Sequence, residues 1–413
     1  MFASLLTPIT TETQGIKGSI KRKPEDFIVG EITQNLEVLD PRLENYKLEG
    51  KSGLFLYFVL IKNNIDTSSA LDWIAKIWNI PRKNISIAGL KDKRALTAQR
   101  VSVWGLKEKF EASKIMEINT PKIRTRSLCL RLKELRLGDL WGNFFEITIR
   151  NIDLDRVTIE NRLRNKFKEI EEKGNILNGF GIQRFGEIRP ITHIVGEKLL
   201  LGDFRLAIKE YVGRVFEQET KEEVEFRRTY WETENINQTL GLIPKYLQIE
   251  NKLLYGLLQT NNDYKQVFLS LPLQFRKLFI HAYQSYLFNK YLSIRYSTYS
   301  KDLSTPINGE KLIDGIVYAP LLGSKTELKG DVEEIYLKLL EKERVSLEDF
   351  YKPLSQKLGG VGTYRPIRML FEKMQFLETS SDELNENKNK AIISFHLRRG
   401  MYATELLKEI LHD

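Results

Sequence analysis

The chain changes its sequence pattern twice, and this alternation constrains the fold more than any other feature. Residues 1–199 mix short apolar runs, typical of strands, with amphipathic helical segments. The pattern over 200–358 is mainly helical and less basic. Over 359–413 the mixed style returns, with an apolar strand at 391–397 and a helix at 402–411. The sequence therefore predicts an α+β protein: a discontinuous mixed-sheet domain, 1–199 and 359–413, that carries an inserted, mainly helical domain, 200–358.

Two helices of the first half have clear start and stop signals. Asp66 or Thr67 can cap a helix that runs to Trp78. Asp155 can cap a second helix, which Gly174 would end. Further segments are predicted from apolar or polar runs: strands at 85–88, 101–104 and 144–149, and a mobile surface loop at 380–390.

Composition excludes several classes of protein. The 413 residues, 42% hydrophobic and 29% charged, are typical of a soluble chain large enough for two domains. No stretch approaches a membrane span, and 1–18 does not resemble a secretory signal, so a cytoplasmic protein is expected. Cys129 is the only cysteine, the four histidines are scattered, and no glycine-rich nucleotide motif is present. We therefore expect no metal, no cofactor and no small-molecule cosubstrate.

Positive charge is concentrated in two stretches of the first half. The net charge is +9, which favours an acidic partner. Over 122–136, cations alternate with Leu128, Leu130 and Leu132, a pattern that predicts a strand with one basic face in solvent. An ordinary solvated face is the alternative. Two such stretches in one half of the chain favour a surface that binds RNA.

The other basic stretch surrounds a single carboxylate, Asp92. Gly89 permits a tight turn after an apolar run, so Asp92 is expected on a loop between two strands. Neighbouring cations favour its ionised form and attract phosphates. A polyanion held against one isolated carboxylate predicts chemistry on a nucleic acid; a plain surface turn is the alternative. Six basic residues share the window 82–100 with Asp92: Arg82, Lys83, Lys91, Lys93, Arg94 and Arg100.

The Asp92 segment resembles the catalytic signature of the TruD family of tRNA pseudouridine synthases, Gly-x-Lys-Asp followed by Thr and Gln. The match falls on Gly89, Lys91, Asp92, Thr97 and Gln99. Two departures from the family pattern, at Gly179 and at Arg398–Arg399, leave this segment intact. Other segments resemble the family in the same order along nearly the whole chain: 21–27, 142–145, 178–186, 282–289, 362–366 and 395–404.

The resemblance implies a pseudouridine synthase catalytic domain with an inserted TRUD-type domain. It implies that the protein isomerises a uridine of tRNA, at position 13 in the D arm, with Asp92 as the catalytic residue. The target base must leave its stack to be reached. The sequence leaves open whether Asp92 acts as the nucleophile or as the base that removes the C2′ proton.

Seven further residues are expected at the substrate: Phe180, Asn178, Lys21, Phe27, Phe395, Lys91 and Arg184. Phe180 is the candidate for stacking on uracil, since small neighbours would leave its ring accessible; a core Phe is the alternative. Asn178 is expected to hold Asp92 or to cap a turn. Lys21 is expected to reach a phosphate or Asp92, with an exposed Lys without a role as the alternative. Arg184 is expected to contact the RNA backbone or to brace the strand of its motif. The aromatic motifs of Phe27 and Phe395 would look the same if these rings only packed.

The sequence leaves two rival functions. One is a non-catalytic protein of the same fold that binds and remodels tRNA, although a retired enzyme has no need for the Asp92 motif. The other is a methyltransferase, which the missing glycine fingerprint disfavours. For a pseudouridine synthase and for a non-catalytic tRNA-binding protein alike, tRNA is the expected partner. A monomer is favoured.

Overall fold

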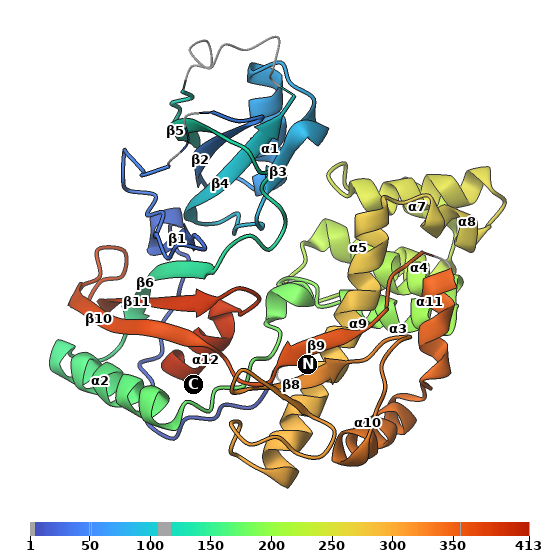
Figure 1. Cartoon of the computed structure of the whole chain (residues 1–413). Helices are drawn as coiled ribbons and strands as arrows, with labels where there is room; N and C mark the ends of the chain where they lie inside the picture. Colours follow the sequence, from blue (N-terminus) through green and yellow to red (C-terminus); the bar gives the residue numbers. More distant parts are fainter. Residues whose placement is uncertain (1–4, 49, 51, 106–116, 356, 413) are drawn as a thin grey trace. The chain divides into compact units, whose positions relative to one another are not determined.

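The computed structural model of the chain describes residues 5–48, 50, 52–105, 117–355 and 357–412 (Figure 1). It divides into two units. We call Thr11–Gly174 with Leu370–Asp413 the sheet unit, and Met1–Thr10 with Asn175–Met369 the helical unit. Met369 N donates to Ile176 O at 2.8 Å, so the chain enters and leaves the helical unit at one place. The inserted domain predicted at 200–358 falls within the helical unit.

The sheet unit is built on one mixed eight-stranded sheet in the order β10-β11-β6-β1-β4-β2-β5, with β3 paired to β4. The β1–β4 pair is parallel and every other pair is antiparallel. The strands are β1 Phe27–Ile32, β2 Phe55–Asn63, β3 Ile85–Ile87, β4 Leu96–Trp104, β5 Ile123–Arg131, β6 Gly142–Ile152, β10 Phe371–Ser381 and β11 Asn389–Arg398.

The register of this sheet brings three distant segments to one end of β4. Ile28 of β1 pairs in parallel with Leu96 of β4, so the segments that lead into these two strands lie side by side. Lys62 of β2 pairs with Thr97 in the antiparallel sense, so β2 ends at the same place. The loop before β4, which contains Asp92, therefore lies beside the segment before β1 and the end of β2.

Three helices complete the sheet unit: α1 Thr67–Ile77, α2 Arg156–Lys173 and α12 Ala403–Leu411. The predicted caps are confirmed, since Asp66 accepts from Ser69 N and Asp155 from Thr158 N, each at 2.9 Å. Gly174 ends α2 in the left-handed region, where a residue without Cβ is favoured. One face of α1 packs on β2 to β5 in a shared apolar core (Figure 1).

Two details of the sheet correct the sequence-based expectations. The strand predicted at 101–104 as alternating is buried from Thr97 to Val103, because β4 is a central strand of the sheet. The polar run 380–390, predicted as a mobile surface loop, is a loop only over 382–388, because its ends belong to β10 and β11 of one hairpin. The Asp382 side chain is fully buried there, held by Arg150.

The helical unit is arranged around α9, the longest helix among the described residues (Figure 1). Buried side chains follow one another around much of α9, as expected for a helix enclosed by its neighbours. None of the described helices, α9 included, has the length and apolarity that crossing a membrane requires. The elements are α3 Thr192–Leu201, α4 Phe204–Gly213, α5 Lys221–Thr233, α6 Ile236–Leu240, α7 Gln248–Gln259, α8 Tyr264–Leu269, α9 Leu273–Ile294, α10 Gly330–Glu343 and α11 Tyr351–Ser355, with a sheet of β7 Lys311–Ile313, β8 Ile316–Leu321 and β9 Thr363–Pro366.

Candidate active site

The Asp92 carboxylate lies on the loop between β3 and β4 and forms an ion pair with Lys21. Lys21 Nζ lies 2.9 Å from Asp92 Oδ1, and the Asp92 side chain is 36% exposed. The same ammonium lies 4.1 Å from the centroid of the Phe27 ring. Of the two partners expected for Lys21, phosphate or Asp92, this structure shows Asp92. The carboxylate is thus charge-paired yet open to solvent on one side.

The backbone of the loop is fixed by buried polar side chains. Lys62, 0% exposed, donates from Nζ to the carbonyl oxygen of Asp92. Gln99 Nε2 donates to Gly89 O at 2.9 Å, and Thr67 Oγ1 accepts from Lys91 N at 3.2 Å. Burial lowers the pKa of Lys62 to about 8, against the opposing effect of Asp92. These contacts hold Asp92 in one place while its side chain faces outward.

Several cations of the basic window turn inward rather than toward solvent. Lys91 and Arg100 both face Glu31, a fully buried carboxylate, at 3.8 Å and 2.7 Å. Burial lowers the pKa of Lys91, and Glu31 opposes this shift. Arg82 instead stays partly exposed, in a surface ion pair with Asp72 at 3.0 Å. Lys91, expected at the substrate, therefore compensates a buried charge in this structure.

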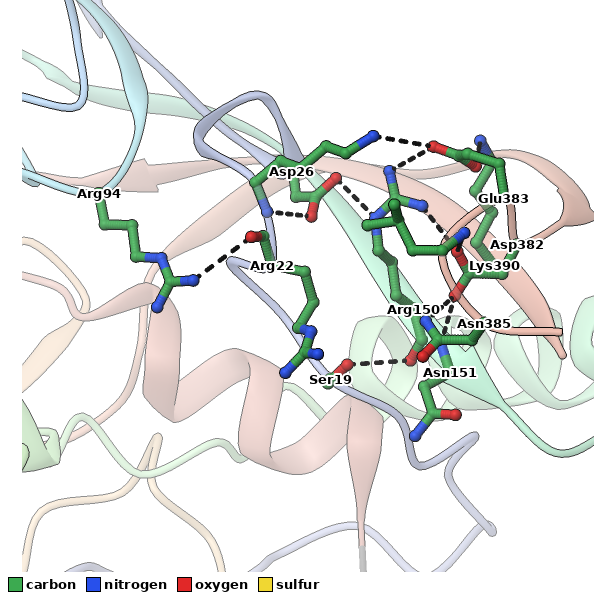
Figure 2. Close-up of polar contacts among 12 residues, drawn as sticks. Ser19, Arg22, Asp26, Arg94, Arg150, Asn151, Asp382, Glu383, Asn385 and Lys390 are labelled. Atoms are coloured by element: carbon green, nitrogen blue, oxygen red, sulfur yellow. Dashed lines mark hydrogen bonds and ion pairs between the residues drawn. The ribbon is translucent and has the colours of Figure 1, made fainter. Parts of the chain in front are cut away.

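The segment that carries Lys21 is anchored at both ends, as Figure 2 shows. Arg94, from the Asp92 loop, donates to Arg22 O at 3.3 Å. Downstream, Asp26 accepts from Arg150 Nε at 2.8 Å. Arg150, 4% exposed, also binds Asp382 at 2.8 Å and so ties this segment to the tip of the β10–β11 hairpin (Figure 2).

The aromatic candidates of the sheet unit are core residues. Phe27 is 1% exposed and Phe395 is 0% exposed. Both rings pack on Phe145, with centroids 6.0 Å and 5.3 Å away. Neither ring therefore offers a surface to a nucleotide in this structure, since the central strands that carry them are covered.

The remaining candidates, Asn178, Phe180 and Arg184, belong to the helical unit. The Asn178 side chain is fully buried: its Nδ2 donates to Pro366 O and its Oδ1 accepts from Arg365 Nη2, both at 2.8 Å. Its amide is thus engaged inside its own unit. Arg184 Nε donates to Ser285 Oγ at 3.0 Å.

Phe180 is far less accessible than the sequence suggested. The residue is 6% exposed, and its ring packs edge-on against Phe288 at 5.9 Å. The guanidinium of Arg365 lies 4.1 Å from the ring centroid, and that of Arg184 lies 5.6 Å away. The expectation of an openly accessible ring is wrong, but Phe180 does line a pocket of about 440 Å³.

The chain offers no obvious metal site in the part that the structure describes. No group of three or more His, Cys, Asp or Glu side chains is arranged there to hold a metal ion.

Two residues around Asp92 were not found from the sequence. Lys62 is the only charged residue of β2, and a lone lysine in a mainly apolar nine-residue strand is the signal that could have indicated it. Arg150 gave no such signal, because its partners Asp26 and Asp382 are more than a hundred residues away on either side.

Comparison with known proteins agrees along the whole chain. Residues 6–316 and 311–410 match the family model described as tRNA pseudouridine synthase D (TruD). A "Probable tRNA pseudouridine synthase D" of Methanococcoides burtonii is 34% identical, covering 97% of this chain and 94% of that protein. One of Methanococcus aeolicus is 36% identical, covering 96% of each. The crystal structure of a TruD protein from Methanosarcina mazei superposes with a TM-score of 0.78 at 32% identity, covering 100% of this chain and 97% of that one.

Proposed function

Since this chain belongs to the TruD family of tRNA pseudouridine synthases, we propose that it isomerises one uridine of tRNA with Asp92 as its catalytic carboxylate. The observation that carries this proposal is the arrangement of Asp92, a charge-paired and partly exposed carboxylate. Hydrogen bonds with the side chains of Lys62, Thr67 and Gln99 hold the backbone of its loop. An orienting scaffold of this kind is what a catalytic group requires.

The reaction needs one carboxylate and no co-reactant. The bond between C1′ and N1 of uridine breaks, the detached uracil turns, and C1′ forms a bond to carbon five. Carbon five then loses its proton and N1 takes one up, so that the product is an isomer of uridine. Asp92 would either attack C1′ or remove the C2′ proton; both routes use an ionised carboxylate near the sugar. The Lys21 ammonium, 2.9 Å from Asp92 Oδ1, would orient that group.

The other candidates take supporting roles. We propose that Phe180 stacks on a base that enters the pocket it lines, and that Arg184 and Asn178 hold the Phe180 segment in shape. Phe27 and Phe395 would support the Asp92 region from the core, and Lys91 would brace its loop through Glu31.

The finer substrate assignment belongs to the same proposal. We infer that the target is the uridine at position 13 in the D arm, that the protein works in the cytoplasm, and that it acts as a monomer. The net charge of +9 suits a polyanionic substrate.

A single incubation tests the function. Purified protein is mixed with an unmodified tRNA transcript and nothing else, and pseudouridine is mapped along the product. We expect one modified site, in the D arm, with the wild type and none with Asp92→Asn. Tight binding without modification by the wild type would instead support a protein that only binds and remodels tRNA.

A further inference from the structure

The pocket beside Phe180 has an unusual charge. Three cations line it, Arg184, Lys277 and Arg365, whereas no Asp or Glu does. Its volume of about 440 Å³ is that of a small-ligand site, for which roughly 300–1,000 Å³ is typical. A pocket with several cations and no carboxylate attracts anions.

Two of these three cations, Arg184 and Lys277, form no ion pair with another described residue. Among the described residues, the Arg184 guanidinium donates one hydrogen bond, to the neutral Ser285 hydroxyl, at 3.0 Å. His281, on the same helix as Lys277, lines the pocket too. Burial lowers the pKa of His281, and the charges of Arg184 and Lys277 lower it further, so these groups converge. Like charges gathered without a counter-charge are unfavourable unless a ligand supplies one.

A glycine-rich loop, residues 359–362, forms one wall of the pocket. Gly359 has a φ of +90°, and a Cβ there would lie 3.0 Å from His281 Nε2. The glycine therefore leaves the imidazole open to the pocket as well as permitting the turn. Within the described ranges, none of the four N–H groups of this loop donates a hydrogen bond. Backbone N–H groups in such loops commonly bind anions.

We propose that this pocket is a phosphate subsite for RNA, with Lys277, His281 and the 359–362 loop as its ligands. The proposal rests on the proposed function, because a nucleotide whose base stacks on Phe180 would carry its phosphate into the same pocket. The subsite would hold that nucleotide by its backbone, independently of its base, and so would position it without selecting it.

The first test measures the anion directly. Inorganic phosphate and, separately, uridine 5′-monophosphate are titrated into the full chain while the His281 ring resonances are followed by NMR. We expect saturable shifts and a rise in the pKa of His281, with the monophosphate binding more tightly because Phe180 contributes stacking. Lys277→Gln should weaken both by about tenfold, the effect of losing a hydrogen bond to a charged group. Unmoved His281 resonances at millimolar phosphate would overturn the proposal.

The second test asks whether RNA is the source of the phosphate. Lys277→Gln should lower tRNA affinity and reduce the slope of log affinity against log salt by roughly 0.7–0.9. Lys290→Gln is the matched control: it removes a charge from the same helix, outside the pocket. Equal slopes for both variants, with phosphate still bound, would restrict the pocket to free phosphate and refute the RNA subsite.

Different results would overturn the proposed function and the proposed phosphate subsite. A wild type that forms no pseudouridine would overturn the proposed function, but the NMR titration and the salt slopes would still decide whether the pocket binds phosphate. A wild type that modifies tRNA, with Lys277→Gln indistinguishable from Lys290→Gln, would overturn only the subsite.

Discussion

Asp92 carries a negative charge in a stretch of chain that otherwise attracts RNA, so one substitution separates chemistry from binding. Asp92→Asn preserves the shape of the side chain but removes its charge. We expect pseudouridine formation to fall by at least the roughly 10²–10⁴-fold typical of a lost acid–base group. Affinity for tRNA should stay equal or increase slightly, because one repulsive charge disappears. Single-turnover assays and binding titrations measure the two effects, and substantial turnover by the variant would refute the role of Asp92.

A substitution of Lys62 separates the effect of this residue on the position of Asp92 from its effect on folding stability. Lys62→Met keeps the length of the side chain but loses the bond to the Asp92 carbonyl, so turnover should fall by up to about 10²-fold. Burial of a charge is costly, so the variant should be at least as stable as the wild type at pH 7. Lys166→Met is the control, since Lys166 is 1% exposed in the same unit and contacts Thr11, not Asp92.

The pH dependence gives Lys62 a second, independent readout. Its pKa is about 8 in the folded protein and 10.5 ordinarily, so between these values the unfolded chain binds one more proton. The contribution of Lys62 to the free energy of unfolding of the wild type should therefore increase as the pH rises from 8 to 10.5. Lys62→Met lacks this contribution, so its advantage in thermal midpoint should shrink across that window. A constant difference would mean that Lys62 titrates normally.

Phe180 combines packing with the proposed stacking, so a truncation to Ala would mix both effects. Phe180→Leu retains much of the buried volume and should cost less than the roughly 3–5 kcal/mol expected for Ala. Loss of stacking should still lower uridine-specific binding or single-turnover rate by the equivalent of about 1–3 kcal/mol. Phe268→Leu, at a ring 1% exposed in the same unit, should lose stability alone. Equal turnover in both variants would make Phe180 purely structural.

Whether the environment of a single residue could be predicted from the sequence depends on how far along the chain its contacting residues lie. Asp92 was found because its surrounding charges are local in sequence. The burial of Phe180 was not, because it depends on Phe288 and Arg365, more than a hundred residues away. Asn178 likewise binds Pro366 rather than a neighbour in its own motif. Contacts across such separations leave no local signal.

For secondary-structure elements, a charge pattern likewise predicts the element but not the ion pairs that its side chains form. The alternation in 122–136 did predict β5, but not how its cations are used. Arg124 and Arg126 both pair with Glu44, at 2.7 Å and 2.8 Å, from a segment that precedes β2. Helix caps were predictable, since a capping carboxylate and the backbone N–H group that donates to it lie within three residues of each other.

These pairings sharpen the prediction for the basic stretches. Lys83 and Lys122 are exposed and have no ion-pair partner among the described residues. Neutralising each to Gln should weaken binding to all tRNAs and reduce the salt slope by roughly 0.7–0.9 units. Neutralising Arg124 or Arg126 should change the slope less, because Glu44 already compensates them. Slopes that rank in the opposite order would place the RNA on the Arg124 face.

For the whole molecule, the fold class could be predicted from the sequence, but the boundaries between the two units could not. A change of pattern along the chain indicated a discontinuous domain with an insertion, and the mixed sheet and the helices are both present. The pattern placed the insertion at 200–358, whereas the helical unit spans Asn175–Met369 together with Met1–Thr10. The additional residues include α3, which packs against α9 and α4 of the helical unit.

Two deletions distinguish these boundaries. Replacing 175–369 by a short Gly-Ser linker should leave a folded sheet unit, because Ile176 and Met369 are hydrogen-bonded to each other and the joined ends lie close. Deleting 200–358 instead would remove α9 and α4, which pack against α3, but retain Val195 and Leu199 of α3, both 0% exposed in the intact chain. We therefore expect a cooperative thermal transition for the first variant and aggregation for the second. The folded variant should retain the Lys21–Asp92 pair yet fail to modify tRNA, since Phe180 and its pocket are gone. Pseudouridine formed by the sheet unit alone would show that the helical unit contributes nothing to the reaction, and aggregation of both variants would show that the sheet unit cannot fold without it.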